Sequence, residues 1–137
     1  MKDTTNEFSF VLKPSSYGVG VFAVHGIKKG THLRLFTNST EGVNHVRRLK
    51  KENIPEAFLD FCVDRGDEMA CPDDFGQMSL GWYMNHSMIG ANVEHKNPAN
   101  EAYQWYASRD IQEGEEILIN YNTLEEPEDS REGYYKK

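Results

Sequence analysis

Short apolar runs that end in turns are the feature that most constrains the fold of this chain. Phe8, Phe10 and Leu12 fall on alternate positions, which is the period of a half-buried strand. Further apolar, β-branched runs cover residues 19–24 and 33–36, and glycines mark the turns between them. These patterns predict small antiparallel β-sheets with tight connections.

The last third of the chain has the same strand-like pattern. The side chains of residues 103–107 alternate toward one face, and residues 117–121 do so again after a turn at Glu113 and Gly114. Beyond them, residues 123–137 are rich in acidic side chains, and we expect this segment to be a mobile tail.

The middle of the chain, about residues 40–80, has a different period and predicts a helical insert. Apolar residues recur at helical spacing over 43–49, and basic residues fill the other face. A second helix is expected to begin with Asn53 as its N-cap and to end at Gly66. The basic stretch 47–51 fits a solvated helix face better than a nucleic-acid patch.

Composition narrows the class of protein. The 137 residues suffice for one domain, and no apolar run approaches the roughly 18 residues that span a bilayer. The first residues form no apolar signal region, so we expect a soluble, intracellular protein without membrane contact. The formal charge of −7 disfavours direct nucleic-acid binding and would attract basic segments. With only Cys62 and Cys71, neither a disulfide framework nor a zinc site is expected, and we predict no metal.

Three short motifs follow one another along the chain. They are a Gly-x-Gly turn at residues 18–20, an Asn-His-Ser turn at 85–87, and an expected strand that ends in Asn120-Tyr121. Taken singly, the first is more often a plain turn and the second a hydrogen-bonded buried turn. A tyrosine on a strand is more often part of the core.

In this order and spacing, the three motifs resemble those of the SET-domain protein lysine methyltransferases. The resemblance covers residues 8–122. It implies a mainly β (α+β) fold of small curved β-sheets, with the short helical insert and a knot-like, threaded C-terminal strand. It also implies that the chain binds S-adenosylmethionine and transfers its methyl group to the ε-amine of a lysine.

The resemblance assigns roles to particular residues. Tyr121 is the expected catalytic residue and also contacts the cofactor. The other expected cofactor-binding residues are Gly18, Gly20, Asn85 and His86. The expected walls of the substrate channel are Phe36, Tyr103, Trp105 and Ile119. A C-terminal aromatic, Tyr134 or Tyr135, closes the cofactor pocket or belongs to a frayed tail.

Methyl transfer explains why these residue types are needed. A free lysine has a pKa of about 10.4, so making its amine neutral at pH 7 costs about 4.6 kcal/mol. A dry channel beside a sulfonium cation lowers that pKa, because burial and a like charge both disfavour the ammonium form. Tyrosine, with a pKa near 10, is a poor base at pH 7, so Tyr121 is expected to orient the amine. The aliphatic Ile119 offers no hydroxyl to hold a water, so addition of two or three methyls is not expected to be blocked.

Two departures from the family pattern keep a second interpretation open. Residues 88–91 lack the Cys and Pro that usually follow the Asn-His-Ser turn, and Asn120 replaces the more usual Asp. Both would suit a catalytically silent SET-like module that binds a basic peptide. The expected partner of the enzyme is a protein substrate with an accessible lysine, histone-like or otherwise basic. The enzyme would act alone or as a homodimer.

Overall fold

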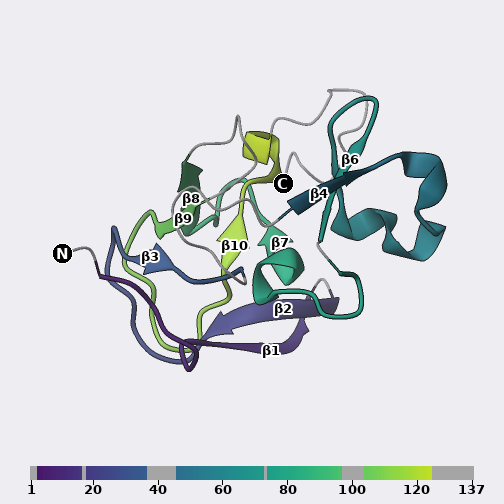
Figure 1. The fold of residues 1–137 in the computed structure, drawn as a ribbon. Coiled ribbons are helices and arrows are strands. Elements are labelled where there is room, and N and C mark those ends of the chain that lie inside the picture. Colours follow the sequence, from purple (N-terminus) through teal and green to yellow (C-terminus); the bar gives the residue numbers. More distant parts are fainter. Residues whose placement is uncertain (1–2, 17, 37–45, 73, 97–103, 125–137) are drawn as a thin grey trace.

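The computed structural model describes residues 3–16, 18–36, 46–72, 74–96 and 104–124, and Figure 1 shows their arrangement. In chain order, the strands are β1 (Phe10–Ser15), β2 (Gly18–Ala23), β3 (His32–Leu33), β4 (Val46–Leu49), β5 (Val63–Asp64), β6 (Met69–Pro72), β7 (Asn85–His86), β8 (Val93–Lys96), β9 (Gln104–Ala107) and β10 (Leu118–Ile119). The 3₁₀ helices are η1 (Lys51–Asn53), η2 (Glu56–Phe61), η3 (Leu80–Tyr83) and η5 (Tyr121–Leu124). The described strands form small sheets of two or three strands, which confirms the predicted mainly β fold.

The first sheet is the antiparallel hairpin β1–β2, in which Phe10 lies opposite Ala23 and Ser15 opposite Gly18. Phe10 is buried, whereas the side chains of Phe8 and Leu12 are 75% and 41% exposed, so the predicted apolar face of residues 8–12 is confirmed only at Phe10. The reason is local: β1 begins only at Phe10, and Asn6 turns the chain just before it by accepting a hydrogen bond from the Phe8 N–H.

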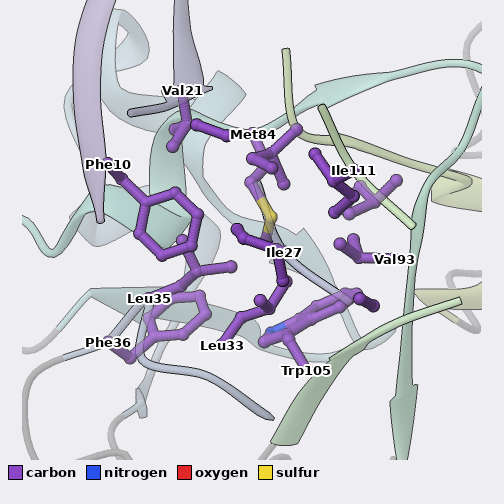
Figure 2. Close-up of a cluster of buried hydrophobic side chains, with 14 of the residues drawn as sticks. Phe10, Val21, Ile27, Leu33, Leu35, Phe36, Met84, Val93, Trp105 and Ile111 are labelled. Carbon is purple, nitrogen blue, oxygen red and sulfur yellow. The ribbon is translucent and has the colours of Figure 1, made fainter. Parts of the chain in front are cut away.

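The second sheet has the order β3-β9-β8, and both pairings are antiparallel. All four residues of β9 are buried, which confirms the predicted strand over the part of 103–107 that the structure describes. Apolar side chains from this sheet and from β1–β2 meet in the main hydrophobic core, shown in Figure 2. Phe10, Val21, Leu33, Met84 and Trp105 contribute to this core.

The third pairing joins β7 and β10, two short parallel strands that come from distant parts of the chain. Leu118 lies opposite Asn85, and Ile119 lies opposite His86. The two strands lie side by side near the middle of the fold (Figure 1). This contact brings the second and third sequence motifs together.

The insert differs from the prediction, because its first part is a strand. The described end of the predicted helix over 43–49 is β4, which pairs with β6 in the sheet β4-β6-β5 at one side of the molecule (Figure 1). Arg47 is exposed, as predicted, but its side chain also contacts the neighbouring segment around β6. Its Nε donates to the Pro72 carbonyl at 2.8 Å, and its guanidinium lies 5.6 Å from the centre of the Phe75 ring. Backbone pairing with β6 outweighs the local helical period, as tertiary context commonly does.

The second predicted helix of the insert is present only as the short 3₁₀ helix η2, and η1 lies before it. Pro55, not Asn53, is the N-cap of η2, and this helix ends at Phe61. Gly66 instead lies in the turn between β5 and β6 with a φ of 92°, a conformation that favours glycine. The insert has its own small apolar cluster, which contains Ile54, Met69 and Cys71.

Both cysteines are free thiols in the insert. Burial, together with a hydrogen bond and repulsion from Cys71, raises the pKa of the Cys62 thiol to about 12. Among the residues described, no group of His, Cys, Asp or Glu side chains is arranged to hold a metal ion. Within the described ranges, no helix is both long enough and apolar enough to cross a membrane.

Candidate active site

Tyr121 and His86 lie side by side, although they are 35 positions apart in the sequence. The β7–β10 pairing places Ile119 beside His86, and the chain then turns into η5, which begins at Tyr121. The Tyr121 N–H donates to His86 Nδ1 at 2.9 Å, and the two ring centres are 5.1 Å apart. Because a backbone N–H can only donate, His86 Nδ1 must be the acceptor nitrogen of the buried ring.

The hydroxyl of Tyr121 is held by the backbone of the other motif. It donates to the Met84 carbonyl, and the two oxygens are 2.6 Å apart. Met84 follows η3 and is buried, so its carbonyl is a fixed point of attachment. The phenol proton is committed to Met84, and the lone pairs of the phenol oxygen can accept a hydrogen bond from another donor.

Asn85 joins the Asn-His-Ser turn to the glycine turn. Its Nδ2 donates to the Val19 carbonyl at 3.0 Å and to Glu116 Oε2 at 2.8 Å, and Ser15 Oγ lies at 3.3 Å. Val19 is the central residue of the Gly18–Gly20 motif, the predicted glycine turn, which in the structure forms the start of strand β2. One amide group therefore connects all three motifs: the glycine turn, the β7 turn and the segment before β10.

The two glycines of the first motif serve different purposes. Gly18 has a φ of 106°, and a Cβ added there would meet no atom of the described residues within 4 Å. Its backbone can therefore be approached from the open side. At Gly20, a Cβ would overlap Glu116 Oε2, so any other residue there would force this flexible carboxylate out of its present position.

Asn92 is fully buried, and its side chain binds the segment that leads into β10. Its Nδ2 donates to the Glu116 carbonyl at 2.8 Å and to Glu115 Oε2 at 3.2 Å, and its Oδ1 accepts from the Leu118 N–H at 2.9 Å. Burial raises the pKa of Glu115, but hydrogen bonds from the Gln112 N–H, Asn92 and Arg109 outweigh it and lower the pKa below its ordinary value. Arg109 also forms an ion pair with Glu115 at 3.0 Å.

Comparison with known proteins identifies the family. The family model described as the SET domain matches residues 18–122, which include all three motifs. The chain belongs to the SET-domain family. This is a lysine methyltransferase family, so the expectation drawn from the motifs is confirmed at that level.

Two solved structures are similar to this SET domain. One is a Plasmodium falciparum protein assigned as a histone methyltransferase, with 26% identity and a TM-score of 0.56, matched over 83% of this chain and 93% of that one. The other is the methyltransferase domain of human PR domain-containing protein 2, at 20% identity and a TM-score of 0.56. The match covers 93% of this chain and 92% of the human domain, and at this level of identity it shows only that the folds are similar. No curated protein sequence matches the chain.

The expected channel residues of the SET domain lie in different places. Ile119 is buried beside His86. Phe36 is buried with its ring edge-on to Trp82 at 5.5 Å. Trp105 is 3% exposed and lies in the main core beside Leu33 and Ile27 (Figure 2). Tyr103, Tyr134 and Tyr135 lie outside the described residues.

Two contributors to the site of this SET domain were not expected from the sequence. The Met84 carbonyl had no sequence signal, because every residue has a carbonyl. Glu116 stood in the Gly-Glu-Glu run that begins at Gly114, where two acidic residues beside a turn are normally solvated. Only the structure shows that one of them contacts the motif asparagine.

Proposed function

We propose that this chain is an S-adenosylmethionine-dependent protein lysine N-methyltransferase. The observation that carries the proposal is the fixed position of Tyr121. Its backbone is bound to His86 and its hydroxyl to Met84, on the two sides of the Asn85 turn. The SET domain is taken to extend over residues 8–122, with 123–137 as the predicted tail. The first two residues of that segment belong to η5, and Leu124 is buried in the main core.

The residues at the meeting point of the motifs fit the cofactor. Open space beside Gly18 permits a ligand to approach the backbone closely, and the Asn85–Val19 hydrogen bond puts this turn next to β7. Gly18, Gly20, Asn85, His86 and Tyr121 are the residues that would hold S-adenosylmethionine. When bound, the cofactor supplies a methyl group on a positively charged sulfur, which a neutral amine can attack.

Tyr121 would orient the substrate amine. Because its own proton is donated to Met84, the phenol oxygen can accept an N–H of the incoming lysine and direct the nitrogen lone pair forward. A positioned acceptor of this kind contributes mainly through alignment. Loss of the lysine proton depends on a dry channel, to which we assign Phe36 and Ile119, both buried. The other two predicted wall residues add no support, because Trp105 lies in the main core and Tyr103 lies outside the described residues. The aliphatic Ile119 has no hydroxyl to hold a water, so addition of a second or third methyl group would not be blocked.

The proposed substrate is a basic protein segment with an accessible lysine. The formal charge of −7 favours such a partner over nucleic acid, and one similar structure is assigned as a histone methyltransferase. An intracellular location, and action either alone or as a homodimer, belong to this proposal, as they did to the prediction from the sequence.

The test is transfer of labelled methyl from S-adenosylmethionine to a histone-tail peptide and to proteins of a host lysate. We expect the wild type to label lysine, and Tyr121→Phe to lose activity by about 100-fold or more, on the scale of a removed positioning hydrogen-bond group. Binding of S-adenosylhomocysteine by Tyr121→Phe, measured by calorimetry, should fall far less than the rate, because phenylalanine keeps the ring beside His86, and this binding serves as the control. A wild type that binds neither form of the cofactor would instead support the silent peptide-binding module.

A further inference from the structure

The carboxylate of Glu116 lies in the space that Gly20 leaves empty. Its Oε2 is 2.8 Å from Asn85 Nδ2, and a Cβ on Gly20 would be 2.2 Å from the same oxygen. The backbone of Glu116 is fixed beside β2 by a bridge to Phe22, and the next residue, Ile117, donates to the Val21 carbonyl at 2.7 Å. The side chain is therefore directed at the glycine turn by a backbone that is itself anchored.

This arrangement fixes the orientation of the Asn85 amide. An amide nitrogen has two protons, and its two closest acceptors are Glu116 Oε2 and the Val19 carbonyl. An ionised carboxylate and a carbonyl can only accept hydrogen bonds. A flipped amide would place its oxygen against both of them, and this repulsion excludes the flip. Asn85 Oδ1 is consequently held on the opposite side from the glycine turn.

We propose that Glu116 is a positioning residue for the cofactor site. It holds the Asn85 amide and the Gly18–Gly20 turn in their binding geometry, and it acts through these groups without touching the methyl group. The inference rests on the proposed use of S-adenosylmethionine. It adds a named requirement, namely that Glu116 and Gly20 work as a complementary pair.

A different role for Glu116 is separable by chemistry. Its negative charge could attract the sulfonium of the cofactor directly, and Glu116→Gln would lose that attraction. The same variant keeps a carbonyl oxygen that can accept from Asn85 Nδ2. Positioning therefore predicts that Glu116→Gln is rescued, whereas direct attraction predicts that it fails, and fails more for S-adenosylmethionine than for the uncharged S-adenosylhomocysteine.

The experiment is calorimetric binding of S-adenosylmethionine and S-adenosylhomocysteine to the full chain. We expect Glu116→Ala to raise the Kd of both compounds about tenfold, which corresponds to one lost hydrogen bond to a charged group. We expect Glu116→Gln to stay within about threefold of wild type. Glu116→Ala binding as tightly as wild type, or Glu116→Gln binding as weakly as Glu116→Ala, overturns the inference. Thermal unfolding checks that each variant is folded, and Glu116→Gln keeps the test valid if the alanine variant does not fold.

A pair of substitutions tests the contact with the glycine turn. Gly20→Ala should weaken binding and lower the unfolding temperature in the wild-type background, because its methyl group overlaps the carboxylate. In the Glu116→Ala background, the same change should lower the unfolding temperature by much less. Strictly additive effects would refute the proposed complementarity. If the wild type binds neither compound, the proposed function is refuted. If the wild type binds both and Glu116→Ala binds them equally tightly, only this inference is refuted.

Discussion

Replacement of Asn92 by alanine tests how β10 is held beneath the site. The side chain is fully buried, and its amide satisfies the Leu118 N–H and the Glu116 carbonyl. Asn92→Ala leaves both backbone groups without this partner, at about 1–3 kcal/mol for each unsatisfied group. Because both lie in a part-buried place where water can partly replace the amide, we expect a total loss of about 2–4 kcal/mol. For a chain of 137 residues this corresponds to a fall in Tm of about 10 °C.

The assay is urea and thermal unfolding of both proteins at pH 7, with Asn53→Ala as a control at an exposed asparagine. The control should unfold within about 0.5 kcal/mol of wild type, as is usual for surface changes. If Asn92→Ala is no less stable than this control, the assignment of Asn92 as a buried link between chain segments is refuted.

An aspartate at the same position adds a pH test with a defined sign. Asn92→Asp would place a second oxygen against the Glu116 carbonyl and the Glu115 carboxylate, which raises the pKa of the new acid in the folded state. Its protonated form can donate to that carbonyl. The variant should therefore be most stable below the unfolded pKa of about 3.9, relative to wild type, and lose that advantage as the pH rises through its folded pKa.

Two further predictions concern residues near the site. Gly81→Ala puts a methyl group 2.4 Å from ring carbons of Phe36, so we expect a loss of about 1–3 kcal/mol in thermal unfolding. Gly26→Ala, where the nearest atom is 3.7 Å away, is the matched control and should change little. A carboxyl-carbon NMR titration should give Glu115 a pKa below its ordinary value, and Arg109→Ala should move it upward. Any stability that comes from this lowered pKa is present above the unfolded pKa of about 4.3 and is lost as the pH falls through the folded pKa. An unchanged Glu115 titration in Arg109→Ala would contradict the role of this guanidinium.

Local patterns predicted the strands that have a buried face and failed where a neighbouring segment decides the structure. Most of the run 19–24 lies in β2, where Val21 and Ala23 face the core, whereas Val19 and Val24 are exposed. The segment 46–49 has residues that would also suit a helix, and only its pairing with β6 makes it a strand. Phe8 looked like part of a buried face, but nothing in its local sequence reveals that the chain turns before β1.

The site itself could be predicted only through the resemblance. No periodicity indicates that His86 and Tyr121 meet, since contacts over such separations depend on the whole topology. The family motifs supplied this expectation for Asn85, His86 and Tyr121, and the structure places these three together. They did not supply the role of Glu116, which depends on the volume left by Gly20.

The position of β10 has a consequence for how the protein comes into existence. This strand pairs with β7, is bound by Asn92, and is preceded by residues that bind β2, so segments made early in synthesis are joined by one made late. A nascent chain that stops short of Ile119 contains the Gly18–Gly20 motif and the Asn-His motif but lacks the complete strand β10, which pairs with β7. Under the proposed function, such a chain would not bind the methyl donor, and the binding site would form in a single late step once this strand had left the ribosome.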